Sequence, residues 1–321
     1  MTSVSEIEII DALKLRTFGN HYQNIIQGIG DDGAVTSVDP DYHLVTTTDA
    51  ITEDVHYPKG IEAKAIGHRC LAVNLSDMAA MGAHPLWASL LFSRPSIDQL
   101  WLEQFVSGFS DLANKHNVSL IGGDTISGPE LFSVTLQGIT PKNKFISRNS
   151  AKIGDLIYVT GFLGNASQGL KIIQGCKEDD SSEKLIQDFL YPNPRVKEST
   201  IISRFATSMI DISDGFFTDI QKVIKASNIG AEIKVSELPI SQSLLNHLSR
   251  KDAINAALLG GDDYELCFTI PRELKKDFNE EYQSKDRIFI TCVGEIKENK
   301  LKLIDEDKKE FVLSGQAFEH F

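Results

Sequence analysis

The sequence of 321 residues has few cysteines, no long apolar run and no excess of basic residues. Its four cysteines are far apart and form no C-x-x-C pair, so neither a zinc site nor a disulfide framework is predicted, and we expect a reducing, cytoplasmic location. No apolar stretch approaches the roughly 18 residues that a membrane span needs. Near the N-terminus, acidic residues stand where a signal peptide would be basic and then apolar.

The formal net charge is −13 at pH 7, which argues against a nucleic-acid partner because binding to a phosphate backbone needs clustered Lys and Arg. The same charge suggests that an anionic substrate needs metal ions to reach its site. A composition of 41% hydrophobic and 24% charged residues is typical of a globular protein with no membrane partner. The chain is long enough for two domains, each with its own core.

Acidic residues recur at turns and at the ends of predicted elements. Residues 28–35 read GIGDDGAV and place Asp31 and Asp32 in a turn framed by glycines. Asp49 ends a predicted strand at 43–49, and Asp77 lies in a predicted helix at 63–81, where Leu71, Leu75 and Met78 form an apolar stripe and Asn74 shares the face of Asp77. Asp124 follows a predicted strand at 118–121, and residues 209–215 (MIDISDG) and 260–265 (GGDDYE) continue the pattern.

A polar, basic segment at 141–150 is predicted to link two domains, at 1–140 and 151–321. Strands at 86–92 and 131–139 and a helix at 97–116 complete the first domain. In the second, a strand at 155–160 precedes a Gly-rich loop at 161–169, which either cradles a phosphate or is a plain strand-to-helix turn, and which is not a Walker motif. Residues 176–183 are predicted to be a surface insertion, a helix is expected from Pro194 to about Ala206, and strands are expected at 266–270, 287–293 and 301–304.

If the fold gathers even half of these acids, their like charges require cations. Hard carboxylate oxygens without His or Cys clusters favour Mg²⁺, which usually completes its shell with water and substrate phosphates. Phosphoryl chemistry on a nucleotide is therefore the leading hypothesis. The competing hypothesis is a calcium-binding structural protein, but no segment has the EF-hand spacing. His56 stands out after the strand that ends at Asp49, although a lone His is more often structural.

Eight segments occur in an order that resembles the thiamine-monophosphate kinase family, in the superfamily of aminoimidazole ribonucleotide synthetase and selenophosphate synthetase. They are GIGDDGAV, TTTDAITEDVHY, AVNLSDMAAMGAHP, IGGDT, SRNSAKIGD, VTGFLGN, DISDGF and GGDDYELCF, and they run from residue 28 to about residue 268. The NLSDMAAMGA and GGDDYELCF segments favour this kinase family over its relatives. The resemblance implies a two-domain fold: an N-terminal α/β domain that dimerises through its sheet, a C-terminal α+β domain, and an active site in the cleft between them.

The resemblance also implies ATP-dependent phosphorylation of thiamine monophosphate to thiamine diphosphate at a site with several Mg²⁺ ions, in a homodimer. The acceptor phosphate is largely deprotonated near pH 7, so we expect direct in-line transfer with no general base and no phosphoenzyme. The alternative is a sibling synthetase that forms a phosphorylated intermediate. Such an enzyme would be expected to have a reactive Cys or Lys near the N-terminus, and this chain has no Cys before Cys70.

Individual residues match the functional positions of the family. The implied metal ligands are Asp32, Thr47, Thr48, Asp49, Asp77, Asp124, Asp211 and Asp214. The implied ATP contacts are Gly123, Asp124, Arg148 and Ser213, and the implied contacts to thiamine phosphate are His56, Asp262 and Phe318. The family often has Glu at the position of Asp262 and Tyr or Trp at that of Phe318. Asp31 is left with an outer-shell or structural role.

Overall fold

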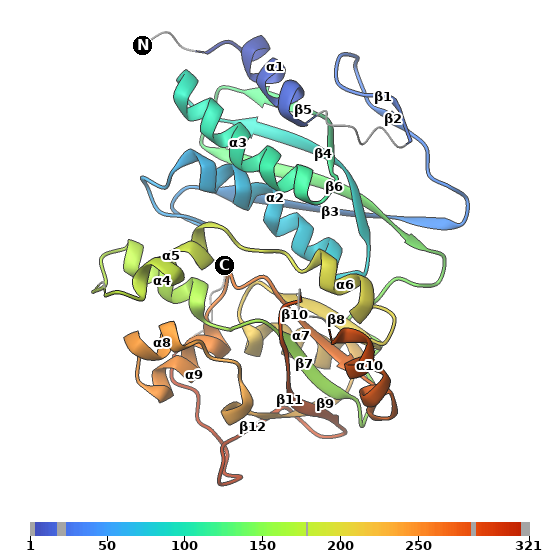
Figure 1. Ribbon diagram of the computed structural model, residues 1–321, viewed down its shortest axis with the longest axis vertical. Coiled ribbons are helices and arrows are strands. Elements are labelled where there is room, and N and C mark those ends of the chain that lie inside the picture. Colours follow the sequence, from blue (N-terminus) through green and yellow to red (C-terminus); the bar gives the residue numbers. More distant parts are fainter. Residues whose placement is uncertain (1–3, 18–23, 178, 284–286, 316–321) are drawn as a thin grey trace. The chain divides into compact units, whose positions relative to one another are not determined.

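The computed structural model describes residues 4–17, 24–177, 179–283 and 287–315 (Figure 1). The chain divides into two compact units, which we call the N-terminal unit (residues 1–78 and 83–143) and the C-terminal unit (residues 79–82 and 144–321). Each unit has its own sheet. None of the helices in the described ranges has the length and apolar character that crossing a bilayer requires.

The N-terminal unit is built on a mixed four-stranded sheet. Its strand order is β3 (Tyr42–Thr52), β6 (Leu131–Pro141), β4 (His84–Ser93) and β5 (Ser119–Ile126). β6 runs antiparallel to both β3 and β4, whereas β4 and β5 are parallel. Side chains alternate along β3, so that Thr47 and Asp49 are half-buried on one face while Thr46 and Thr48 are exposed on the other.

Helices α2 (Ala63–Ala80) and α3 (Gln99–Lys115) lie against one face of this sheet (Figure 1). The predicted apolar stripe of α2 is confirmed, because Leu71, Leu75 and Met78 are fully buried. The two helices cross where each has a glycine: a Cβ atom on Gly67 would lie 2.1 Å from the Phe105 carbonyl oxygen, and one on Gly108 would lie 1.9 Å from that of Lys64. Only glycine permits so close a crossing.

Three further elements belong to the N-terminal unit: α1 (Glu6–Thr17), β1 (Ile25–Gln27) and β2 (Val35–Thr36). β1 and β2 pair antiparallel as a two-stranded sheet of their own, and the acidic turn at 28–34 connects them.

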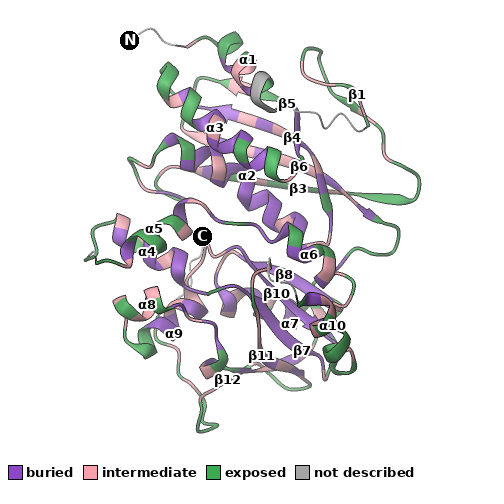
Figure 2. Ribbon diagram, in the orientation of Figure 1, coloured by how far each residue is buried: buried purple, intermediate pink, exposed green. Residues whose placement is uncertain are grey.

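The C-terminal unit is built on a six-stranded sheet. Its order is β12 (Lys302–Ile304), β9 (Gly230–Lys234), β11 (Ile290–Lys297), β7 (Leu156–Thr160), β10 (Glu265–Ile270) and β8 (Ser208–Ile212). Every residue of β7, β8 and β10 is buried (Figure 2). Helices α7 (Phe216–Ser227) and α9 (Arg250–Leu259) pack into the core on one face, and Phe278 of α10 (Lys275–Tyr282) packs on Tyr158 and Phe268 from the other. Burial on both faces explains why these strands have continuous apolar sequences.

The remaining helices of the C-terminal unit are α4 (Asn165–Ile173), α5 (Ser182–Leu190), α6 (Val196–Ile202) and α8 (Gln242–His247), with short 3₁₀ turns η1 (Val235–Glu237) and η2 (Arg272–Leu274). Several predicted boundaries were wrong. The helix expected from Pro194 to about Ala206 is α6, which begins at Val196 and ends at Ile202, and the strand expected at 287–293 is β11. The strand expected to end at Asp49 continues to Thr52, and the strand expected at 118–121 extends to Ile126. Asp124 therefore lies inside β5 and not in a turn after it, because the pairing of β4 with β5 continues through Gly122 and Gly123.

Candidate active site

In the N-terminal unit, the inward face of β3 meets the C-terminal half of α2. The Thr47 hydroxyl donates a hydrogen bond to Asp77 Oδ2, and the Asp49 backbone N–H donates one to Asn74 Oδ1 at 3.1 Å. The structure thus brings together three of the predicted metal ligands. Asn74 was given no role from the sequence, yet it is fully buried and fixes the backbone of Asp49.

The electrostatics of this pair follow from its burial. Burial, the charge of Asp77 and a hydrogen bond to Asp77 raise the pKa of the Asp49 carboxyl to about 6. Two carboxylates that share a site resist ionising together, and a bound cation removes that penalty. The arrangement therefore favours a cation next to Asp49 and Asp77.

Thr48 has a different environment from its neighbours. Its side chain is exposed on the opposite face of the sheet, where its hydroxyl lies 2.9 Å from that of Thr135 on β6. Its hydroxyl therefore does not lie with Asp49 and Asp77, because successive side chains of a strand point to opposite faces.

Gly123 and Asp124 lie on β5, at the other edge of the same sheet. A Cβ atom on Gly123 would lie 2.0 Å from the Leu90 carbonyl oxygen, so the close approach of β5 to β4 requires glycine here. Asp124 is exposed, and its Oδ1 accepts a hydrogen bond from Thr125 N–H at 2.9 Å. Since β6 and β4 lie between β3 and β5, Asp124 and Asp49 are three strand spacings apart, about 14 Å in a flat sheet.

The turn between β1 and β2 contains Asp31 and Asp32, and both side chains are exposed. Asp31 Oδ1 accepts a hydrogen bond from Asp32 N–H at 2.9 Å. Asp31 therefore bonds within its own turn, and its predicted outer-shell or structural role stays a prediction.

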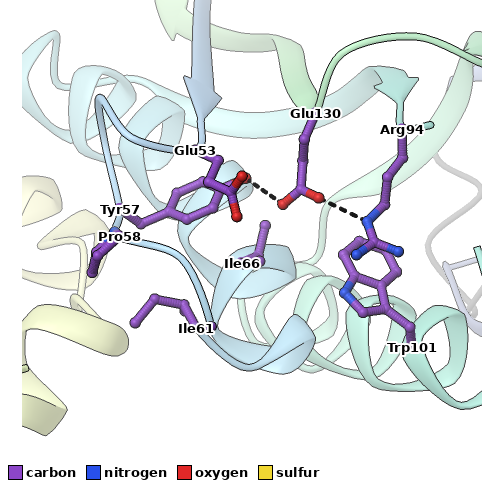
Figure 3. A pocket seen from close by; sticks show the side chains of 9 residues that line it. Glu53, Tyr57, Pro58, Ile61, Ile66, Arg94, Trp101 and Glu130 are labelled. Carbon is purple, nitrogen blue, oxygen red and sulfur yellow. Dashed lines mark hydrogen bonds and ion pairs between the residues drawn. The ribbon is translucent and has the colours of Figure 1, made fainter. Parts of the chain in front are cut away.

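His56 lies in a tight turn after β3. Its Nδ1 accepts a hydrogen bond from Thr52 N–H at 3.2 Å, and its own N–H donates to the Thr52 carbonyl at 3.0 Å. Figure 3 shows how the turn is anchored: Glu130 accepts from the Tyr57 hydroxyl at 3.0 Å and from Arg94 Nε at 2.8 Å. These bonds hold the backbone that carries His56.

The same anchor forms one wall of a cavity of about 210 Å³. The Arg94 guanidinium lies 4.1 Å from the ring centroid of Trp101. The cavity is lined by Glu53, Tyr57, Pro58, Gly60, Ile61, Ile66, Arg94, Trp101 and Glu130.

In the C-terminal unit, the junction of β8 and α7 carries Asp211, Ser213 and Asp214. Asp211 is buried in β8. The fully buried Asp219 accepts the backbone N–H groups of Ser213 and Asp214 on one oxygen, each at 3.0 Å. Asp219 had no predicted role, and it fixes the loop that carries the predicted ATP contact Ser213 and the predicted metal ligand Asp214.

Lys222 offsets part of the negative charge at this junction. Its ammonium lies 2.6 Å from Asp214 Oδ2 and 2.7 Å from Asp219 Oδ1. Burial acts to lower the pKa of Lys222, but its hydrogen bonds to the two carboxylates outweigh burial and raise the pKa, so the lysine is charged. One of the predicted metal ligands thus has a cation from the chain itself as its partner.

The loop between α9 and β10 is joined to this junction by backbone bonds. Asp262 N–H donates to the Ser213 carbonyl and Tyr264 N–H donates to that of Ile212, both at 2.9 Å. The Tyr264 hydroxyl donates to Asp262 Oδ1 at 3.0 Å. The predicted substrate contact at Asp262 and the predicted ATP contact at Ser213 are therefore adjacent in one framework.

The Gly-rich loop after β7 is a strand-to-helix turn. Asp263 accepts hydrogen bonds from Gly164 N–H at 2.6 Å and from Ala166 N–H at 3.3 Å, at the N-terminus of α4. Burial raises the pKa of Asp263, while these two backbone bonds act to lower it. A carboxylate of the chain already occupies the N–H groups that a phosphate would use. Of the two interpretations of residues 161–169, the phosphate cradle is therefore wrong for these groups.

A buried ion pair lies next to this loop, at the start of β10. Arg195 Nε lies 2.6 Å from Glu265 Oε2, and Thr160 donates its hydroxyl to that oxygen at 2.5 Å. The pair joins the start of α6 to the first residue of β10.

The structure does not place the predicted contacts Arg148 and Phe318 beside other predicted site residues. The Arg148 side chain is exposed, and its carbonyl accepts a hydrogen bond from the Ser227 hydroxyl at 3.1 Å. Phe318 lies outside the described residues. In the part of the chain that the structure describes, no three His, Cys, Asp or Glu side chains are grouped closely enough to hold a metal ion by themselves.

Comparison with known proteins assigns the family. Family models of AIR synthase related proteins match residues 30–140 with the N-terminal domain and residues 152–306 with the C-terminal domain. A thiamine-monophosphate kinase from Buchnera aphidicola is 38% identical over 325 residues, which cover 99% of both chains. This chain belongs to the thiamine-monophosphate kinase family.

Solved structures of this family have the same fold. The thiamine-monophosphate kinase of Stenotrophomonas maltophilia has a TM-score of 0.86 and 36% identity, with 97% of this chain and 99% of that chain covered. The AaThiL complex with AMPPCP and TMP has a TM-score of 0.76 and 27% identity, with 98% and 97% covered. The two-domain α/β and α+β fold expected from the resemblance is confirmed.

Proposed function

We propose that this chain transfers the terminal phosphoryl group of ATP to thiamine monophosphate and releases thiamine diphosphate. The observation that carries the proposal is the meeting of Thr47, Asp49 and Asp77 at positions that match metal ligands of the family, in a chain whose similarity to a member spans 99% of its length. A related structure holds AMPPCP and TMP, an ATP analogue and a phosphorylated acceptor, in the same fold.

We further propose that Mg²⁺ ions bind at these acids. The donors fit, because Mg²⁺ takes one or two carboxylates and fills its shell with water and substrate phosphates. The raised pKa of Asp49 marks a pair of carboxyls that gains from a cation. Asp32, Thr47, Thr48, Asp49, Asp77, Asp124, Asp211 and Asp214 are the proposed ligands, with Thr48 contributing through its backbone because its hydroxyl is on the opposite face. When bound, Mg²⁺ supplies charge neutralisation between two phosphorylated anions.

The other proposed roles are to hold the metal ligands in place and to bind the two substrates. We propose that Asn74 fixes Asp49 and that Asp219 fixes Ser213 and Asp214, so that the ligands are held before substrates arrive. Gly123, Asp124, Arg148 and Ser213 contact ATP, and His56, Asp262 and Phe318 contact thiamine phosphate. No residue acts as a general base, and transfer is direct.

A homodimer is also part of the proposal. The helices of the N-terminal unit lie on one face of its sheet, and the other face presents Leu44 with 47% of its surface exposed, beside Thr46, Thr48 and Ala50 (Figure 1). Within the described part of the N-terminal unit no helix packs on this face, and its exposed Leu44 and Ala50 favour pairing with a second copy. Sedimentation should give a dimer for the wild type and a monomer for Leu44→Lys; a wild-type monomer would contradict this part.

For the division of labour, we propose residues 1–140 as the metal-binding, ATP-binding and dimerisation domain, 141–150 as linker and 151–321 as the domain that completes the site. The cytoplasm is the proposed location, because all four cysteines are free thiols.

The deciding experiment incubates the protein with ATP and Mg²⁺, and offers thiamine monophosphate, thiamine and the substrates of the related synthetases in parallel. We expect thiamine diphosphate only from thiamine monophosphate, and none after EDTA. Absence of product from protein that melts cooperatively would refute the function. Asp41 is an exposed acid just before β3, and Asp41→Asn is the matched control for acid variants. Trapping a phosphorylated protein on the turnover pathway would contradict direct transfer.

A further inference from the structure

The loop at 260–265 has an unusual backbone. Asp262 has a φ of 68° and Tyr264 a φ of 49°, both in the left-handed region. Asp tolerates this region because its short side chain can bond locally, but a bulky aromatic there is a genuine outlier. Such strain persists only where the surroundings determine the conformation, and it is concentrated at functional sites.

Several contacts of the C-terminal unit impose this conformation. The backbone N–H groups of Asp262 and Tyr264 are bonded to the carbonyls of Ser213 and Ile212. Asp263 lies between these two residues and directs its carboxylate into the N-terminus of α4. Glu265, the next residue after Tyr264, directs its carboxylate to Arg195 and Thr160. Three neighbouring acids of this segment, Asp262, Asp263 and Glu265, therefore have three different sets of partners.

The side chain of Asp262 is held from within the loop. Tyr264 is 93% buried, with an exposed fraction of 7%, and its hydroxyl reaches back two residues to Asp262 Oδ1 at 3.0 Å. A hydroxyl that donates to one carboxylate oxygen restricts the rotamer of the acid. This hydrogen bond joins two residues that both have a left-handed backbone.

We propose that Tyr264 is a positioning residue for substrate recognition: its hydroxyl fixes the carboxylate of Asp262 in the orientation that meets the thiamine part of the substrate. The inference rests on the proposed function and on the assignment of Asp262 to the substrate. The ligand chemistry is suitable, because the thiamine moiety offers an exocyclic amine and a cationic ring, both of which bind an oriented carboxylate. Tyr264 acts through Asp262 and has no contact of its own with the reacting phosphates.

The test compares Tyr264→Phe with Tyr158→Phe, a second buried tyrosine of the same unit whose ring stacks on Phe268. KM is measured for thiamine monophosphate and for ATP, together with kcat and Tm. We expect Tyr264→Phe to raise KM for thiamine monophosphate about three- to tenfold, the effect of one hydrogen bond to a charged group that acts indirectly. KM for ATP and kcat should change by less than about twofold, and Tyr158→Phe should leave both KM values near wild type.

A double-mutant cycle with Asp262→Gly tests whether the two residues act as one. Glycine adopts the backbone conformation of Asp262 without strain and removes the carboxylate. We expect Asp262→Gly to raise KM for thiamine monophosphate more than Tyr264→Phe does. The double variant should have the KM of Asp262→Gly alone, because a positioning hydroxyl has nothing to position once the acid is gone.

The outcomes separate the positioning role of Tyr264 from the proposed kinase function. Equal increases in both KM values, an unchanged KM for thiamine monophosphate, or multiplicative effects in the double variant would each overturn the role of Tyr264. KM for ATP in the same preparation reports whether a variant has kept its fold. If the wild type and Tyr158→Phe make no thiamine diphosphate, the proposed function itself fails, whatever Tyr264 does.

Discussion

Asp49 and Asp77 of the N-terminal unit face each other, and the pKa of Asp49 rises to about 6. Asp214 and Asp219 of the C-terminal unit are also close acids, but Lys222 lies 2.6 Å and 2.7 Å from them. In the first pair the like charges repel without a nearby cation of the chain, whereas in the second pair Lys222 offsets part of the negative charge. Carboxylates at the proposed metal positions are therefore not equivalent. Asp49 and Asp77 gain most from an added cation, whereas at Asp214 an added cation must displace Lys222 or bind beside it.

The largest effect on turnover should come from removing a charge at Asp49 and Asp77. Asp77→Asn keeps the size of the side chain but removes the carboxylate that receives the Thr47 hydroxyl. We expect turnover to fall about 10³-fold, the size of effect seen when a charge-stabilising group is lost. Formation of thiamine diphosphate measures it, with Asp41→Asn as control. Near-normal turnover would remove Asp77 from the proposed metal site.

At Asp214 and Asp219, Lys222→Met should destabilise the protein by about 2 kcal/mol, because Asp219 is fully buried and loses its cation. Denaturant unfolding in EDTA measures the loss. Mg²⁺ should then raise Tm more in the variant than in the wild type, since the added cation replaces the lysine at Asp214. Equal gains in both proteins would mean that Lys222 and Mg²⁺ do not compete.

At Asp49 and Asp77 the free energy of unfolding should fall as pH rises. The unfolded chain ionises Asp49 near pH 4, whereas the folded protein holds the proton until pH is about 6. The contribution of Asp49 to stability is therefore complete below pH 4 and is lost as pH rises through 6.

In EDTA, Asp49→Asn should consequently be more stable than the wild type by about 2 kcal/mol at pH 7, and the difference should shrink toward pH 5. Denaturant unfolding across this range checks the sign. A difference that does not vary with pH would show that Asp49 has an ordinary pKa.

The smallest effect is expected on the outer face of β3. Thr48→Val removes a hydroxyl that pairs with Thr135, and should change kcat by less than about twofold. Thr47→Val removes the donor to Asp77 and should lower kcat by about tenfold. A large loss in Thr48→Val would place that hydroxyl, and not only its backbone, in the metal site.

Much of the fold followed from local patterns. The stripe of Leu71, Leu75 and Met78 defined α2, and runs of β-branched residues defined the long strands. Asp124 was misplaced because glycines usually interrupt strands, whereas here Gly123 is required by the approach of β5 to β4.

The supporting residues of the candidate site were harder to predict. Asp219 and Asp263 look like ordinary acids in sequence, and their roles depend on backbone N–H groups that the fold brings to them. A signal for Asp219 did exist, since it is an acid among the apolar residues of α7. Nothing local distinguishes Asp263 from Asp262, because the left-handed backbone that separates their directions arises from tertiary contacts.

The crossing of α2 and α3 has a consequence for the angle at which Asp77 is presented. An α-helix turns about 100° per residue, so the face that a helix shows to its sheet is set wherever its rotation is blocked. Gly67 and Gly108 block it: each backbone rests against the other helix with no room for a methyl group. This contact lies ten residues before Asp77, about 15 Å along the axis. It acts as a pivot that fixes the rotational phase of α2 and so keeps Asp77 aimed at Thr47 from a distance.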